Sequence, residues 1–129
     1  MKGGGARLKF AILCDDGRRE DNGKIMLIGI YGANIVIPVF PANLSLCLAL
    51  FISADQEEEM PVQFKVNLNG DVITDGGGTY KFAKADNIIS LVPHIPVSAP
   101  SPGVLTLEVK FGDADWVTAV TIPLEKRAA

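Results

Sequence analysis

The sequence has little of the side-chain chemistry on which most enzymes and metal sites depend. It contains one histidine and two cysteines among 129 residues. Two cysteines and one histidine cannot complete a structural zinc site without carboxylates. Any Ser-His-Asp or Cys-His arrangement would have to use His94, and the chain has no Gly-x-Ser-x-Gly segment. We therefore expect His94 to be exposed or held by structural bonds, and we expect no enzyme activity and no cofactor.

An excess of basic charge and a long apolar run are also missing. The net charge is −3 at pH 7, so the chain offers no basic field to a phosphate backbone, and nucleic-acid binding is not expected. The longest apolar stretch, 44–54, is about half of the roughly 20 residues that a membrane-spanning helix needs. Positive charge in 1–9 is not followed by an apolar region of signal-peptide length. These absences favour a cytoplasmic protein that binds neither nucleic acid nor membrane.

Helical periodicity is absent as well, whereas alternation with a period of two recurs along the chain. Turn residues separate about eight such segments, which is typical of an all-β fold. We predict a single antiparallel immunoglobulin-like β-sandwich. A closed β-barrel is the alternative, because alternation alone does not decide closure. The sandwich is expected over residues 9–124, after a flexible lead-in over 1–8 and before a tail over 125–129.

Several segments predict particular strands. Leu44–Ile52 is apolar or small throughout, so we expect a central strand covered on both faces. Residues 62–69 alternate apolar and polar, which predicts a half-exposed strand, and Asn69-Gly70 then supplies a hairpin turn. Residues 25–39 form one long strand or two, and the prolines after Val92 predict an edge strand or a loop.

Residues 76–79 read Gly-Gly-Gly-Thr. They lack the spacing of a phosphate-binding loop and do not open a helix. We expect them to form a flexible connection to the next strand.

Cys14 and Cys47 both lie in apolar, strand-like segments. In a cytoplasmic protein such cysteines are usually buried free thiols. A disulfide between the two sheets is the alternative, and it requires both side chains to face the same gap.

The most distinctive segment is a polar stretch, Asp15–Lys24, between two apolar runs. Arg18 and Arg19 could bind a carboxylate or a phosphate of a partner, with Glu20 beside them. Alternatively, the same arginines pair with the acidic side chains of this stretch, and Asn22-Gly23 makes the turn into the next strand. We favour the architectural interpretation, in which the segment joins the first two strands.

The segment 12–32 also carries a resemblance. Cys-Asp-Asp-x-Arg-Arg-Glu-Asp-Asn-Gly-Lys at 14–24, followed by Leu-Ile-Gly-x-Tyr at 27–31, resembles the signature of a family of small bacterial proteins of unknown function. The resemblance implies a bacterial source and a compact β domain, and it implies no activity, substrate or catalytic residue. Separately, Pro102–Val109 is similar to the penultimate strand of many immunoglobulin-like domains.

Six aspartates are expected at strand ends: Asp15, Asp16, Asp71, Asp75, Asp113 and Asp115. Calcium-binding sandwiches gather such carboxylates at one end, because the ion takes six to eight oxygen ligands. Aspartate also favours turns for its own backbone hydrogen bonds, and no Asp-x-Asp-x-Asp-Gly loop is present. Calcium or a small ligand at these residues is therefore the alternative function.

Trp116 is the best single candidate for an exposed contact residue, because it follows the turn of the last predicted hairpin. With Tyr31 and Tyr80 it could form an aromatic platform for a sugar or a base, although packing over the open end of the sandwich is the commoner arrangement. We predict a non-enzymatic binding or structural module that assembles with itself or with another protein. Arg18, Arg19, Glu20 and Trp116 are its candidate contact residues.

Overall fold

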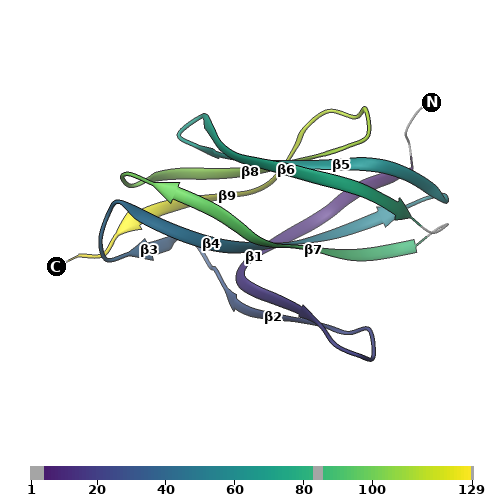
Figure 1. Cartoon of the computed structure of the whole chain (residues 1–129), viewed down its shortest axis with the longest axis horizontal. Coiled ribbons are helices and arrows are strands. Elements are labelled where there is room, and N and C mark those ends of the chain that lie inside the picture. Colours follow the sequence, from purple (N-terminus) through teal and green to yellow (C-terminus); the bar gives the residue numbers. More distant parts are fainter. Residues whose placement is uncertain (1–4, 83–85, 129) are drawn as a thin grey trace.

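The computed structural model describes residues 5–82 and 86–128, and these residues form nine strands and no helix. The strands are β1 (Ala6–Arg19), β2 (Ile25–Ile30), β3 (Ile35–Ile37), β4 (Ala42–Ala54), β5 (Glu58–Leu68), β6 (Asp71–Phe82), β7 (Asp86–Ala99), β8 (Gly103–Phe111) and β9 (Val117–Lys126). They form two layers, shown in Figure 1, with the order β2-β1-β4-β7 in one sheet and β3-β9-β8-β5-β6 in the other. The predicted all-β sandwich is confirmed, and over these described residues the two sheets do not close into a barrel.

The strands add two details to the prediction. Residues 25–39 form two strands, which is one of the two predicted alternatives, and these strands belong to different sheets. The described part of the chain therefore has nine strands, against about eight predicted. One pair, β3 with β9, is parallel, because the chain crosses from one sheet to the other between Ile30 and Ile35. The remaining pairs are antiparallel.

The ends of the sandwich also lie outside the predicted limits. β1 begins at Ala6 rather than Lys9, because Ala6 pairs with Ala54 across β4. At the other end β9 runs to Lys126, and the amide of Arg127 donates to the carbonyl oxygen of Ile37 at 2.8 Å. The first four residues of the predicted lead-in and the last residue of the tail lie outside the described residues.

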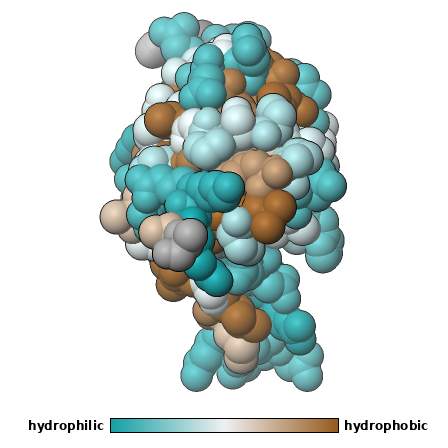
Figure 2. Space-filling view, turned by 90° about the vertical axis from the view of Figure 1, so that its left-hand side faces the viewer, coloured by the Kyte–Doolittle hydropathy of each residue, from teal (hydrophilic) through white to brown (hydrophobic). Residues whose placement is uncertain are grey.

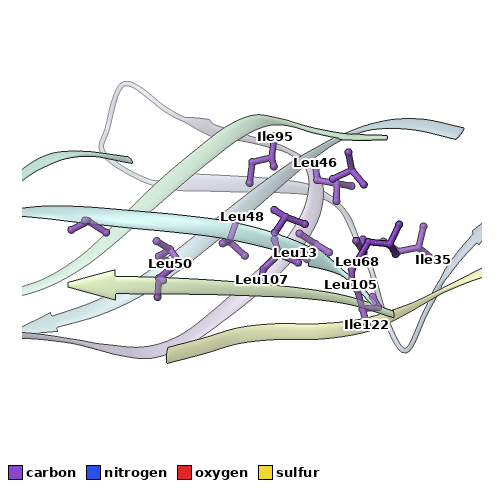
Figure 3. Close-up of a cluster of buried hydrophobic side chains, with 14 of the residues drawn as sticks. Leu13, Ile35, Leu46, Leu48, Leu50, Leu68, Ile95, Leu105, Leu107 and Ile122 are labelled. Atoms are coloured by element: carbon purple, nitrogen blue, oxygen red, sulfur yellow. The ribbon is translucent and has the colours of Figure 1, made fainter. Parts of the chain in front are cut away.

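The core lies between the two sheets and is mainly aliphatic, with Phe82 and Phe111 among its buried side chains. Figure 3 shows leucine and isoleucine side chains from both layers meeting in the gap, among them Leu48 of β4 and Leu107 of β8. β4 is also covered on its outer face, where Cys47 and Ala49 are fully buried. The prediction of a central strand with two covered faces is therefore confirmed.

The hairpin between β5 and β6 follows its sequence signal. Asn69 and Gly70 both have left-handed backbones, with φ of 52° and 91°. A two-residue hairpin turn of type I′ requires a positive φ at both of its central residues. The glycines of 76–79 differ from the prediction, because they lie inside β6 and pair with β5 instead of forming a flexible connection. Gly76 lies opposite Phe64, whose ring occupies the space that a side chain would need.

β7 is an edge strand, which is why it tolerates Pro93 and Pro96. Its register against β4 shifts, because Leu46 and Leu48 lie opposite Ile95 and Val92. β7 therefore carries one extra residue, a bulge at Pro93 and His94, and His94 has a left-handed backbone with φ of 57°.

Candidate functional site

The polar stretch of the sequence forms part of a hairpin that leaves the body of the sandwich. β1 pairs with β4 only as far as Cys14, and from Cys14 to Arg19 it pairs with β2 instead. Figure 1 shows β2 and the end of β1 projecting below the two layers. We call β1 from Cys14 onward, the turn and β2 the projecting hairpin.

The turn of this hairpin is shorter than predicted. Asp15, Asp16 and both arginines belong to β1, so only 20–24 lie between the strands. The amide of Glu20 donates to the carbonyl oxygen of Lys24 at 2.8 Å, and the amide of Gly23 donates to that of Glu20 at 2.9 Å. Gly23 has φ of 88°, and the amide of Lys24 donates to the side chain of Asn22 at 3.0 Å. Asn22-Gly23 thus makes the turn, as predicted.

The two arginines have different partners. The Nε of Arg18 donates to Oδ2 of Asp16 at 3.1 Å, and this bond lowers the pKa of the Asp16 carboxyl. The guanidinium of Arg19 reaches β7 and donates to the carbonyl oxygen of Ile89 at 2.9 Å. Arg18 therefore orders the hairpin itself, whereas Arg19 ties it to the four-stranded sheet.

The inner face of the hairpin covers the outer face of β4 and β7. A Cβ atom on Gly17 would lie 3.0 Å from the side chain of Leu91, 3.1 Å from the sulfur of Cys47 and 3.3 Å from the side chain of Leu27. Only glycine lets β1 approach this closely without a shift of these neighbours. This contact explains why Cys47 is buried on a face that a sandwich normally exposes to solvent.

Cys14 and Cys47 are free thiols, and they lie opposite each other on neighbouring strands of one sheet. The alternative of a bridge between the sheets is therefore wrong. The Cys14 thiol donates to the carbonyl oxygens of Asp16 at 3.3 Å and Cys47 at 3.6 Å. Burial raises the pKa of Cys14, and burial together with the neighbouring Cys14 raises the pKa of Cys47 to about 12. Buried thiols with raised pKa values are poor nucleophiles, so neither cysteine is a candidate nucleophile.

The base of the hairpin is held by a side-chain bond. The Tyr31 hydroxyl donates to Oδ1 of Asp15, and burial and this carboxylate raise the pKa of Tyr31 to about 12. The Asp15 carboxylate lies against Gly29, which has φ of 71° and no room for a Cβ atom. Asp15 is thus a structural residue of the hairpin base.

The outer face of the hairpin carries an apolar row that the sequence did not reveal. Met26, Ile28 and Ile30 of β2 are 44, 42 and 59% exposed. Figure 2 shows brown side chains on the projecting lower part of the molecule, next to teal ones. β2 is apolar at every position except Gly29, so its periodicity does not show which side chains face solvent. The register against β1 decides this, because Met26 lies opposite Arg18 and Ile28 opposite Asp16.

Trp116 lies far from these residues, next to the outer face of the five-stranded sheet. The ammonium group of Lys65 stands 4.2 Å from the centre of its ring. The half-buried ring borders a shallow cavity of about 550 Å³ over Gly77 and Thr79 of β6. Trp116 therefore does not pack over an open end of the sandwich. Tyr31 lies at the hairpin base and Tyr80 packs against the core, so the three rings do not form one platform.

The aspartates are dispersed. Asp15, Asp16 and Asp75 lie within strands rather than at strand ends, because pairing continues past them. Asp71 begins β6 beside one end of the five-stranded sheet, and Asp113 and Asp115 lie in the β8–β9 turn at the other end (Figure 1). Over the described ranges, 5–82 and 86–128, no three histidine, cysteine or acidic side chains are grouped to hold a metal ion. His94 is exposed on the β7 bulge.

In the described part of the chain, no helix is long and apolar enough to cross a membrane. No curated protein matches the sequence at a significant level. A family model described as a family of unknown function (DUF6941) matches residues 9–124. Since this match covers most of the sequence, the chain belongs to that family of unknown function.

Proposed function

We propose that this chain is a non-enzymatic assembly module whose projecting hairpin pairs with the same hairpin of a second copy. The observation that carries the proposal is the outer edge of β2. β2 is last in the order β2-β1-β4-β7, so its other edge has no strand beside it in the part of the chain that the structure describes. An exposed apolar edge strand is a template for pairing with another chain.

The sequence of β2 suits pairing with itself. In an antiparallel pair with its two-fold axis at Ile28, the two copies of Ile28 face each other and Met26 faces the partner's Ile30. All three positions belong to the exposed apolar row. The same register places Lys24 opposite glycine 32, so no like charges meet.

The neighbouring strand supplies a polar border. Asp16 and Arg18 of β1 share the outer face with Ile28 and Met26, and they are already paired with each other. Association would therefore cover the apolar row without burying an unpartnered charge. An apolar centre with a polar rim is the usual anatomy of a protein interface.

Sedimentation equilibrium over a range of protein concentrations tests this proposal. We expect the wild-type mass to rise toward that of a dimer. Ile28→Lys places two ammonium groups at the two-fold axis, so it is expected to raise the dissociation constant by about tenfold or more. Val104→Lys is the matched control, because Val104 of β8 is 43% exposed against 42% for Ile28 and lies in the other sheet.

Two results would count against self-assembly. One is a wild-type chain that stays monomeric at every concentration. The other is an Ile28→Lys variant that associates as strongly as Val104→Lys and the wild type, since the interface would then lie elsewhere.

Three finer points are also proposals. An immunoglobulin-like arrangement is supported by the orders β1-β4-β7 and β9-β8-β5-β6, which correspond to strands A-B-E and G-F-C-C′ of that sandwich. The resemblance of 12–32 supports a bacterial source, and the scarcity of cysteine supports the cytoplasm.

A further inference from the structure

The two sheets fail to close against each other along one side, between the edge strands β6 and β7. Two hydrogen bonds bridge this side. The Thr74 hydroxyl donates to the carbonyl oxygen of Pro96 at 2.6 Å. The Ser90 hydroxyl donates to the hydroxyl oxygen of Tyr80 at 2.9 Å. Between these bridges lies the glycine run of β6. We call the opening between the two bridges the slot.

On the β6 side, the slot is open because the glycines have no side chains to fill it. Gly76 and Gly78 lie opposite Phe64 and Val62, whose side chains point between the sheets, so both glycines face inward. A Cβ atom on Gly76 would lie 2.8 Å from the Phe64 ring, so close packing against this ring accounts for a glycine at position 76. A Cβ atom on Gly78 would have no neighbour within 4 Å. The space at Gly78 is therefore empty without any packing reason.

On the β7 side, the slot is open because the strand is irregular there. Its bulge at Pro93 and His94 shifts this part of the strand out of regular register. The result is a cavity of about 200 Å³ lined by Leu50, Val62, Phe64, Tyr80, Leu91 and Pro93, among others. No charged side chain is among the described residues that line it.

The chemistry of the slot is that of a site for a small apolar molecule. An apolar cavity of roughly 150 Å³ in a protein core stays dry and accepts benzene. The slot is of this size class, and it opens at a strand edge instead of being sealed. Gln63 and Tyr80 are the polar side chains among its described lining residues. The Tyr80 hydroxyl accepts from Ser90 and so keeps its own hydrogen for another acceptor.

We propose that the slot binds a small uncharged molecule that has one ring and one hydrogen-bond acceptor. The ring lies against Phe64, Val92 and Pro93, and the acceptor receives the hydrogen of Tyr80. This site is separate from the outer edge of β2, so it does not depend on the assembly proposed above.

Fluorine NMR with 4-fluoroacetophenone as the probe tests the proposal on the full chain. This molecule has one ring and one carbonyl acceptor. We expect its signal to broaden and shift with wild-type protein, and we expect fluorobenzene, which lacks the acceptor, to bind about tenfold more weakly. The anion 4-fluorobenzoate is expected not to bind, because the slot would bury its charge without a partner.

Three variants locate the binding. Gly78→Leu fills the slot and is expected to abolish binding, and Gly78→Val serves the same purpose with a smaller side chain should the first variant not fold. Tyr80→Phe is expected to weaken the binding of 4-fluoroacetophenone to the affinity of fluorobenzene for the wild type. Thr79→Val, on the outer face of the same strand, is the control that keeps wild-type affinity. Absence of binding to the wild type, or equal binding to a folded Gly78 variant, overturns the proposal.

Discussion

Arg18 and Arg19 are neighbours in β1 but have different structural roles. Successive residues of β1 point to opposite faces, so Arg18 lies on the solvent side with Asp16 and Arg19 turns toward β7. A surface ion pair such as Arg18–Asp16 contributes little, since water screens both charges. The bond from Arg19 to the Ile89 carbonyl oxygen links the hairpin to the sheet and should matter more.

Arg19→Ala is therefore expected to lower the free energy of unfolding by about 1 kcal/mol, and Arg18→Ala is expected to leave it nearly unchanged. Urea denaturation of both variants measures the difference. Arg19→Lys is the control, because its single ammonium group keeps the charge and loses the planar geometry. Equal effects of the two alanine variants would contradict separate tasks for Arg18 and Arg19.

The burial of Cys47 and Tyr31 predicts that the stability of the chain depends on pH. The pKa of Cys47 is about 12 in the folded chain against an ordinary value of 9.0, and the pKa of Tyr31 is raised to about 12 from 10.0. Above pH 9 the unfolded chain loses these protons while the folded chain keeps them. The folded state then binds more protons, so stability is full below the unfolded values and falls as the pH rises toward about 12.

Urea denaturation at a series of pH values between about 8 and 10.5 tests this expectation. The free energy of unfolding should decrease across the series, and the decrease should be smaller in Cys47→Ala. A wild-type stability that is level or rises over this range would show that the thiol is not buried as described.

At the scale of elements, β6 was the least predictable strand. Three consecutive glycines favour a loop in any sequence-based interpretation, because glycine lacks a side chain to pack and loses much backbone freedom in a strand. Pairing with β5 overrides this preference, since Phe64 needs the space above Gly76. By contrast, the alternation of β5 and the Asn69-Gly70 turn were readable, because local chemistry determines both.

The glycines of β6 should differ sharply when each is replaced by alanine. A Cβ atom on Gly77 would lie 2.7 Å from the Val62 carbonyl oxygen, a backbone atom that cannot move aside. Gly77→Ala is expected to cost about 2 kcal/mol. Gly78→Ala has open space and is expected to stabilise the chain by about 0.5 kcal/mol, because it restricts the unfolded state.

Thermal unfolding of the two variants measures this contrast. The melting temperature should fall for Gly77→Ala and rise slightly for Gly78→Ala. A fall of similar size in both variants would mean that the space at Gly78 is not open.

At the scale of the molecule, the sandwich was predictable and the projecting hairpin was not. Strand periodicity and turn residues sufficed for the fold class and for the covered faces of β4. The sequence also contained one sign of the hairpin, because Cys47 and Ala49 on the outer face of β4 needed a cover. Which segment supplied that cover depended on long-range pairing of β1, which leaves β4 at Cys14, and periodicity carries no such information.

The same limit applies to the candidate site. Arg18, Arg19 and Glu20 were found as a polar stretch and do share the hairpin, whereas Trp116 lies on the other sheet. The apolar row of β2 was missed, because Ile25–Ile30 is apolar on both faces and only the register against β1 separates them. The edge that carries the proposed function is thus a property of the tertiary structure.

Hydrogen exchange of the β2 amides, measured at low and high protein concentration, tests the central claim most directly. If β2 pairs with β2 of a second copy, amides of 26–30 that face away from β1 exchange more slowly as the concentration rises, and Ile28→Lys removes this dependence. Exchange of these amides at the same rate at every concentration would contradict assembly through this edge.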